Sequence, residues 1–270
     1  MSPLGADAPP TGVNARWRSM LFVPGNRPDL AAKAPRARPD VVVLDLEDAV
    51  PPAAKVDARA SVREAAAALT GTVPVCVRVN PPGTEWFDGD VAALPEGILA
   101  VVVPKLEAPI DLGRPVVAGI ETVRGVADAR DALGGSVVAC YFGAEDYVAD
   151  LGGVRTDANA EVATARALVA MAARLAGVPA LDLVTLDFGD GDRFTREAGE
   201  ARALGYAGKL CIHPAQVALA NEAFLPSADE VDRAHRLLAA FDAAGGMTIA
   251  FEGQMVDEVV AARARAILSA

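Results

Sequence analysis

The 270-residue sequence has few of the residues that bind transition metals or form disulfides. It has only two histidines and three cysteines, and each cysteine (Cys76, Cys140, Cys211) lies inside a separate apolar run. No HxH or CxxC pattern occurs, so we do not expect a zinc site. We interpret the cysteines as buried free thiols in a reducing compartment, which excludes a disulfide-stabilised domain.

The sequence also lacks a basic cluster and a long hydrophobic segment. It has 25 Lys and Arg against 36 Asp and Glu, a net charge of −11, so a nucleic-acid partner is not expected. The first residues lack the apolar region of a signal peptide, and no apolar run is long enough to cross a bilayer. We therefore expect a cytoplasmic protein without a membrane partner, and we interpret residues 1–15 as a disordered N-terminal tail.

Short apolar runs recur along the chain and are rich in Val, Leu and Ile, as is typical of parallel strands covered on both faces. Eight such runs occur, at 18–25, 41–48, 73–80, 98–105, 114–121, 137–146, 181–187 and 206–213. Segments with helical spacing separate most of them, and the short link between the fourth and fifth runs leaves room for a helix of a turn or two. This alternation predicts an α/β fold, a (β/α)8 TIM barrel over residues 16–225.

An open doubly wound sheet is the second interpretation of the same alternation. It requires a glycine-rich phosphate turn after the first strand, and the sequence there is PGNRPD, with a single glycine. Residues 226–270 follow the predicted barrel. Ser227 and Glu230 form a capping pattern that predicts a helix, and FEGQMVDEVVAARARAIL predicts a short loop and a second helix.

Polar residues gather at the C-terminal ends of the predicted strands, which in a TIM barrel meet at one mouth. They are Arg27, Asp45, Glu47, Asp48, Arg78, Asn80, Lys105, Glu121, Glu145, Asp146, Asp187 and His213. Converging carboxylates repel one another and are costly to desolvate, so cations must lie among them. Arg78 and Lys105 supply some positive charge. Mg²⁺ bound by Glu121 and Asp146 would supply the rest.

Several of these residues have a structural interpretation as well. Asp45 or Asp48 could cap the following helix. Arg78 could form a structural ion pair, and His213 could simply hydrogen-bond a loop. The pattern of strand ends does not decide between these roles and catalytic ones.

Eight ordered motifs extend from about residue 16 to the C-terminus: RSMLFVPGNRPDLAAKA, VVVLDLEDAV, VRVN, VVVPK, IET, GAEDYVADLGG, GYAGKLCIHPAQV and FEGQMVD. In this order they resemble the citrate lyase β-subunit-like family of the HpcH/HpaI aldolase/citrate lyase superfamily, which includes malyl-CoA and citramalyl-CoA lyases. The compact length and the FEGQMVD ending most resemble free-standing actinobacterial members. The resemblance implies a Mg²⁺-dependent carbon–carbon lyase, with Mn²⁺ as the alternative metal. Its substrate would be a carboxylated 3-hydroxyacyl-CoA thioester, split into acetyl-CoA or a related acyl-CoA and a keto acid.

The resemblance also implies roles for individual residues. Glu121 and Asp146 would hold the metal, and Arg78 would bind the substrate carboxylate. Asp257 would be the catalytic acid and base, brought from a neighbouring subunit of a homotrimer or a dimer of trimers. Glu47 and Asp48 would assist catalysis by holding metal-bound waters and Arg78. Further substrate contacts would come from Phe22, Val23, Arg27, Lys33, Glu121, Glu145, Ile212 and His213.

A C-terminal segment that carries a catalytic aspartate would also act as a lid, and Gly253 in EGQM would be its hinge. Other functions stay open. They are the β subunit of a citrate lyase complex acting on a carrier-bound citryl thioester, a malyl-CoA thioesterase, and a non-catalytic binding protein. A pyruvate-type metal aldolase is disfavoured because the strand ending DLEDAV lacks the histidine base of those relatives.

Overall fold

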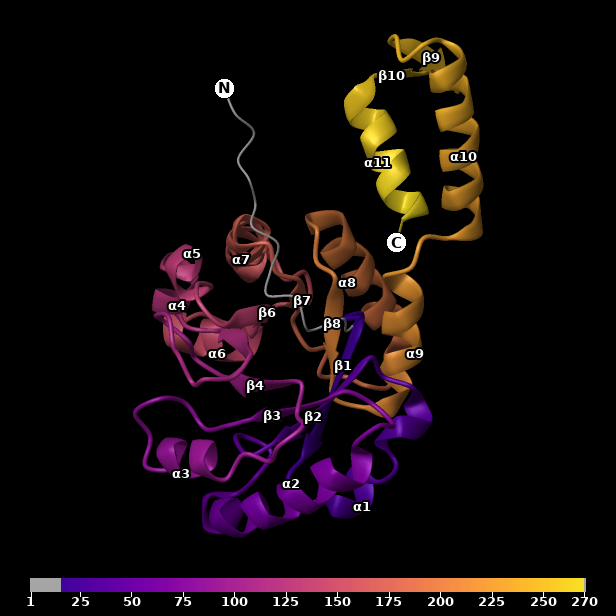
Figure 1. The fold of residues 1–270 in the computed structure, drawn as a ribbon. Helices are drawn as coiled ribbons and strands as arrows, with labels where there is room; N and C mark the ends of the chain where they lie inside the picture. The colour runs from indigo at the N-terminus through magenta and orange to yellow at the C-terminus, as the bar shows by residue number, and fades with distance from the viewer. Residues whose placement is uncertain (1–15, 270) are drawn as a thin grey trace. The chain divides into compact units, whose positions relative to one another are not determined.

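The computed structural model describes residues 16–269, so the predicted tail at 1–15 lies outside the described residues. Eight parallel strands close into a barrel in sequence order (Figure 1). The strands are β1 Ser19–Pro24, β2 Val41–Asp45, β3 Val75–Arg78, β4 Ala100–Val103, β5 Val116–Ile120, β6 Val137–Phe142, β7 Ala180–Asp182 and β8 Gly208–Cys211. The barrel closes where Leu21 of β1 pairs with Cys211 of β8. Each strand overlaps one of the eight predicted runs, and the predicted TIM barrel is confirmed.

Helices cover the outside of the barrel (Figure 1). They are α1 Pro28–Ala31, α2 Lys55–Leu69, α3 Phe87–Ala92, α4 Val123–Ala127, α5 Ala129–Ala132, α6 Ala144–Leu151, α7 Ala163–Ala176, α8 Gly191–Leu204 and α9 Pro214–Ala223, with 3₁₀ turns at Ala34–Ala37, Pro52–Ala54 and Ala160–Val162. The short helix predicted between β4 and β5 is wrong, because residues 104–115 contain no helix. Pro104, Pro109 and Pro115 interrupt this segment, and proline in a helix interior removes a hydrogen-bond donor and clashes with the preceding turn.

The strands bury both faces, which explains why their sequences are apolar throughout. One set of side chains fills the barrel interior: Met20, Val41, Val43, Cys76, Ala100, Val102, Val117, Ala139, Tyr141, Leu181 and Leu210. The alternate residues pack under the helices, as Val42 and Leu44 do in one core cluster with Val62 of α2. All three cysteines are buried and free, as predicted, and burial raises the pKa of each to about 12. None of the described helices combines the length and hydrophobicity that a bilayer crossing requires.

The chain divides into two compact units, Met1–Phe224 and Leu225–Ala270. The second unit consists of α10 Ala228–Ala243, the strands β9 Ile249–Phe251 and β10 Gln254–Val256, and α11 Glu258–Leu268. Its own small core contains Ala234, Leu237, Phe241, Val256, Ala261 and Ala264. The predicted capping pattern is present, since Ser227 and the side chain of Glu230 cap α10 reciprocally.

A hairpin replaces the loop predicted before the last helix. Strands β9 and β10 pair antiparallel, with Gln254 opposite Phe251. Glu252 and Gly253, between them, have φ values of 48° and 78°. Two consecutive positive φ angles are the mark of the tight turn that joins hairpin strands, so in this structure Gly253 serves a turn.

Candidate active site

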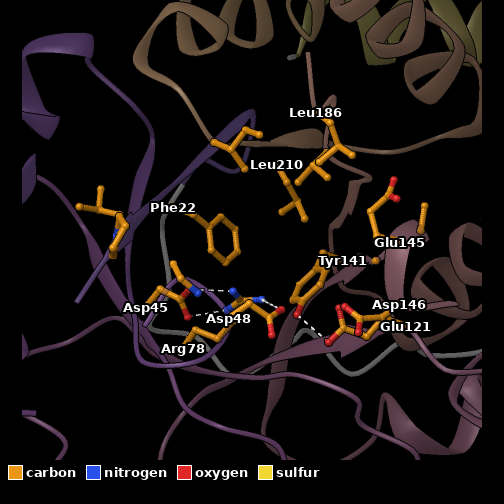
Figure 2. A pocket seen from close by; sticks show the side chains of 17 residues that line it. Phe22, Asp45, Asp48, Arg78, Glu121, Tyr141, Glu145, Asp146, Leu186 and Leu210 are labelled. Atoms are coloured by element: carbon orange, nitrogen blue, oxygen red, sulfur yellow. Dashed lines mark hydrogen bonds and ion pairs between the residues drawn. The ribbon is translucent and has the colours of Figure 1, made fainter. Parts of the chain in front are cut away.

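A cavity of about 390 Å³ lies at the C-terminal ends of the barrel strands (Figure 2). Its walls come from the ends of seven of the eight strands and from the start of α6. They are formed by Phe22, Val23, Pro24, Asp45, Asp48, Ala49, Arg78, Glu121, Tyr141, Gly143, Ala144, Glu145, Asp146, Val184, Leu186, Leu210 and Ile212. This is the end of a TIM barrel at which ligand sites are built.

Arg78, the last residue of β3, forms the centre of an ion-pair network in this mouth. Its Nε and Nη2 donate to the two carboxylate oxygens of Asp45 at 2.7 and 2.8 Å (Figure 2). Its Nη1 lies 2.7 Å from Oε2 of Glu47 and 3.9 Å from Oδ2 of Asp48. Burial acts to raise the pKa of Asp45, but the Arg78 guanidinium and two backbone N–H donors lower it below its ordinary value.

Glu47 lies just beyond β2 and is 3% exposed. Its Oε1 accepts a hydrogen bond from Nζ of Lys105 at 3.0 Å. Its Oε2 has the ion-pair contact with Arg78 but accepts no hydrogen bond from the described residues. Lys55 holds the backbone here, with its Nζ 2.6 Å from the Glu47 carbonyl oxygen and 2.7 Å from Oδ1 of Asn80. Burial raises the pKa of Glu47 despite the two nearby cations.

Glu121 and Asp146 bring two more carboxylates to the mouth, from the end of β5 and the first turn of α6. Oε1 of Glu121 accepts from the backbone N–H of Lys105 at 2.9 Å and from the hydroxyl of Tyr141 at 3.2 Å. Oδ1 of Asp146 lies 3.0 Å from Nζ of Lys105. Burial, together with the charges of Glu47 and Asp146, raises the pKa of Glu121 to about 7. The site therefore holds more negative charge than its own cations balance.

Tyr141 belongs to this site, although sequence reasoning did not select it. Its side chain is 1% exposed, its ring packs edge-on against Phe22 at 6.4 Å, and burial raises the pKa of its hydroxyl well above the ordinary value. Gly119 makes room for it, because a Cβ at this position would lie 2.4 Å from the tyrosine hydroxyl. The motif CYFGAED could have identified this residue, because Tyr141 lies near the end of a strand, where alternate side chains point into the barrel.

Other predicted substrate contacts lie in the cavity wall. Phe22, Val23 and Ile212 give it an apolar side. The ring of Phe22 also lies 5.0 Å from the guanidinium of Arg78. Glu145 lines the wall too, where its Oε1 accepts from Nε of Arg155 at 2.8 Å.

Three predicted contacts do not line this cavity. Arg27 is exposed and pairs with Asp29 at 2.8 Å, and Lys33 is exposed after α1. His213 caps α9: its Nδ1 accepts from the backbone N–H of Ala215, the second residue of the helix, at 3.2 Å, and its ring stacks on Phe188 at 4.7 Å. In this structure His213 thus makes a local hydrogen bond to the start of a helix, and not to a loop as the alternative interpretation had it.

Asp257 belongs to the second unit, Leu225–Ala270. It is the N-cap residue of α11, and its Oδ1 accepts from the backbone N–H of Val260 at 3.1 Å. Capping is a structural role that aspartate fills well, and it leaves the second carboxylate oxygen without a bond to the helix. The catalytic role of Asp257 stays a prediction.

Comparison with known proteins identifies the family. The model of the HpcH/HpaI aldolase/citrate lyase family matches residues 18–114 and 113–214, which is most of the barrel. The chain belongs to this family. A citrate lyase subunit beta-like protein of Deinococcus radiodurans is 49% identical to it, over 97% of this chain and 99% of the relative. The citrate lyase subunit beta of Leuconostoc mesenteroides subsp. cremoris is 33% identical, over 93% and 92%.

The fold comparison agrees with the family. The crystal structure of CitE from Mycobacterium tuberculosis, in complex with magnesium, acetoacetate and coenzyme A, matches with a TM-score of 0.84 and 37% identity. The match covers 93% of this chain and 96% of that one. The predicted resemblance to citrate-lyase-β-like proteins is thus confirmed, and the chain is a member of a family of lyases.

Proposed function

We propose that this protein is a Mg²⁺-dependent carbon–carbon lyase that cleaves or forms a carboxylated 3-hydroxyacyl-CoA thioester. The products of cleavage would be acetyl-CoA, or a related acyl-CoA, and a keto acid. The observation that supports this function best is the surplus of carboxylates around the cavity: Asp45, Glu47, Glu121 and Asp146 face Arg78 and Lys105. The magnesium, acetoacetate and coenzyme A in the related CitE structure support the same chemistry.

Glu121 and Asp146 are the residues that would hold the metal. Both offer oxygen ligands, and Mg²⁺ commonly takes one or two protein carboxylates together with water and substrate oxygens. Both residues line the same cavity, and burial together with the charges of Glu47 and Asp146 raises the pKa of Glu121 to about 7, so these carboxylates fit a divalent cation. Mn²⁺ would be accepted by the same oxygen ligands. When bound, the ion would act as a Lewis acid on the hydroxyl and carboxylate oxygens of the substrate.

Arg78 would bind a substrate carboxylate through one edge of its guanidinium. Asp45 already occupies the Nε and Nη2 edge, so a ligand would use the Nη1 and Nη2 edge and would share Nη1 with Oε2 of Glu47, 2.7 Å away. Asp45 fixes the guanidinium in turn, because its oxygens also accept from the backbone N–H groups of Glu47 and Ala49 at 2.9 and 3.1 Å. A fixed guanidinium edge binds a carboxylate with short, directional hydrogen bonds. Glu47, and Asp48 at the rim, would then help to orient Arg78 and the waters around the metal.

The acyl thioester would lie along the apolar wall formed by Phe22, Val23 and Ile212, with Glu145 and His213 near its path. The exposed Arg27 and Lys33 would meet the phosphates of CoA outside the cavity. Lysine and arginine are suited to phosphate as point charge and fork respectively. This arrangement would place the charged end of the cofactor in water and the reacting carbon in the barrel.

Asp257 would act as the acid and base, donated by a neighbouring subunit of a homotrimer or a dimer of trimers. In cleavage the substrate hydroxyl would pass its proton to a water in the mouth, its oxygen would become the carbonyl of the keto acid, and the electrons of the broken C–C bond would form the enolate of the acyl thioester. Asp257 would give the enolate carbon a proton, and in synthesis it would remove that proton. The unit that carries it would act as a lid, since excluded water cannot hydrolyse the thioester.

Product analysis tests the reaction. The purified protein would be given malyl-CoA, citramalyl-CoA, citryl-CoA and 3-hydroxy-3-methylglutaryl-CoA, each with Mg²⁺ and with a chelator. We expect one of them to give an acyl-CoA and a keto acid only when the metal is present. Free CoA with an intact hydroxy diacid would point to a thioesterase instead. Activity that needs a carrier-bound thioester would point to a subunit of a citrate lyase complex.

Subunit mixing tests the donated aspartate. Asp257→Asn keeps a good helix cap but removes the acid, so we expect a loss of about 10²–10⁴-fold in turnover with normal folding. Glu121→Ala should lose the metal response. Neither variant is active alone in this proposal, but co-refolded mixtures should regain part of the wild-type turnover, because some sites combine an intact Glu121 with an intact Asp257. Mixtures that stay inactive would show that Asp257 does not act across an interface.

A further inference from the structure

We propose that Lys105 is the internal counter-ion of the metal site. Its ammonium holds Asp146 when no metal is bound and gives way to the divalent cation when one binds. The proposal rests on the metal site of the proposed function, and it adds a positioning residue that acts through the carboxylates. Lys105 therefore lowers the affinity of the site for metal while it keeps the metal-free site assembled.

The contacts of Lys105 reach both carboxylates of the proposed metal site. Its backbone N–H donates to Oε1 of Glu121 at 2.9 Å. Its Nζ lies 3.0 Å from Oδ1 of Asp146 and 3.0 Å from Oε1 of Glu47. No divalent ion can share Asp146 with an ammonium at this distance without strong repulsion. Metal binding to Asp146 therefore favours movement of the ammonium away from this carboxylate.

The backbone of Lys105 shows that the contact with Glu121 is maintained against a local cost. Its φ is 51°, in the left-handed region where glycine is favoured. A non-glycine residue stays in this region when the surrounding structure fixes it, and such residues cluster at functional sites. Here the unusual backbone directs the N–H to Glu121 and the side chain into the mouth. A glycine would satisfy the backbone but would supply no ammonium.

Glu47 would keep the ammonium of Lys105 in the mouth when metal binds. The ammonium already contacts Glu47, and the flexible four-carbon stem lets Nζ leave Asp146 without leaving Glu47. Arg78 alone does not satisfy the carboxylate of Glu47, because Oε2 of Glu47 accepts no hydrogen bond from the described residues. The lysine thus moves between two carboxylates of the same mouth rather than out into water.

Calorimetric titration of the metal-stripped protein with Mg²⁺ tests this role. Lys105→Met removes the competing ammonium, and we expect it to tighten Mg²⁺ binding by about tenfold, about 1.4 kcal/mol. Lys105→Gly should give the same change, and glycine suits the positive φ, so this variant folds even if the methionine variant does not. Arg114→Met is the matched control, because it removes one positive charge before β5, at the opposite end of the barrel. Its Mg²⁺ affinity should equal that of wild type.

Two outcomes would overturn the proposal, and they can be told apart. If wild type binds Mg²⁺ and both Lys105 variants bind it equally or more weakly, Lys105 is no counter-ion of the metal, while the metal site and the lyase proposal stand. If neither wild type nor the variants bind Mg²⁺ or Mn²⁺, the metal site itself is refuted, and the Lys105 proposal with it.

Discussion

Charged side chains are buried at the barrel mouth and also between β7, β8 and the helices that cover them. In the second place, Nε and Nη2 of Arg166 donate to both oxygens of Asp182 at 3.1 and 2.8 Å. Nζ of Lys209 lies 3.3 Å from Oε2 of Glu197, which also accepts from the hydroxyl of Thr185 at 2.6 Å. We call this group the β7–β8 network. Its cations and carboxylates balance, whereas the mouth has an excess of carboxylates.

The two places show that the partners of a buried carboxylate decide its state together with burial. Glu197 is 1% exposed and Glu121 is 2% exposed. Burial acts to raise the pKa of both, but Lys209 and the donors around Glu197 lower its pKa to about 2. Around Glu121 the neighbouring Glu47 and Asp146 add to burial, and the pKa rises to about 7. One network is complete within the chain, and the other is short of a cation.

The opposite shifts give opposite dependences of stability on pH. The folded pKa of Glu197 is depressed, so its stabilising contribution is full above the ordinary value of 4.5 and is lost as the pH falls toward 2. The folded pKa of Glu121 is raised, so without metal the folded state binds a proton more readily than the unfolded state does. Its contribution therefore becomes unfavourable as the pH rises from 4.5 through 7.

The largest effect should come from breaking the balanced network. Lys209→Met leaves Glu197 and Asp182 buried without the ammonium that lies 3.3 and 3.8 Å from them. Removing one partner of a buried ion pair costs about 3–5 kcal/mol of unfolding free energy. Urea-denaturation midpoints would measure it. The control is Arg196→Met, at an exposed position next to Glu197 on helix α8. It should change the unfolding free energy by no more than about 0.5 kcal/mol. Equal midpoints for the two variants would show that the network does not stabilise the fold.

The same substitution should act in opposite directions in the two networks. At pH 8 without metal, Glu121→Gln removes an unfavourable buried charge and should stabilise the protein, while Glu197→Gln removes a favourable one and should destabilise it. The pKa of Glu121 is raised from 4.5 to about 7 and that of Glu197 is lowered from 4.5 to about 2, so each change is on the order of 3 kcal/mol. Glu222→Gln, at an exposed site on α9, should have little effect. If both substitutions change the unfolding free energy in the same direction, the contrast between the two networks is refuted. It is also refuted if Mg²⁺ still stabilises the Glu121→Gln variant.

The sequence predicts the mouth far better than it predicts the β7–β8 network. Carboxylates after apolar runs identify Asp45, Glu47 and Glu121, because the topology of a barrel brings all strand ends together. Asp182 and Lys209 are charged residues inside the strand sequences LDL and GKL. A charge within a buried strand indicates a buried ion pair, so these two residues could have been predicted. Arg166 and Glu197 lie on helices, where charged residues usually face solvent, so nothing in the sequence shows that they turn inward.

Other features of the site depend on local geometry that no pattern encodes. The motif around Lys105 shows a strand end but not the positive φ that directs its N–H to Glu121. His213 precedes a proline, and only the structure shows that its ring caps α9. Asp257 is identified by its motif alone, because its contacts in the second unit are those of a helix cap.

The smallest expected effect comes from removing the hydroxyl of one buried tyrosine in each network. The hydroxyl of Tyr141 donates to Glu121 at 3.2 Å, and that of Tyr206 donates to the backbone carbonyl of Arg166 at 2.9 Å. Tyr141→Phe and Tyr206→Phe each remove one buried hydrogen bond, worth about 1 kcal/mol. Only Tyr141 touches a proposed metal ligand. Tyr141→Phe should therefore weaken Mg²⁺ binding by about fivefold, about 1 kcal/mol, in a calorimetric titration at pH 8.

Tyr206→Phe should leave the Mg²⁺ affinity unchanged and lower the unfolding free energy by about the same 1 kcal/mol. The backbone N–H of Lys105 still holds Oε1 of Glu121 in the Tyr141 variant, which is why we expect a partial loss rather than an abolished site. If both variants bind Mg²⁺ as wild type does, the tyrosine hydroxyl does not position the ligand. If both weaken it equally, the two networks are coupled through the barrel wall. In that case the balance of charge behind β7 and β8 would be part of the metal site rather than a separate support of the fold.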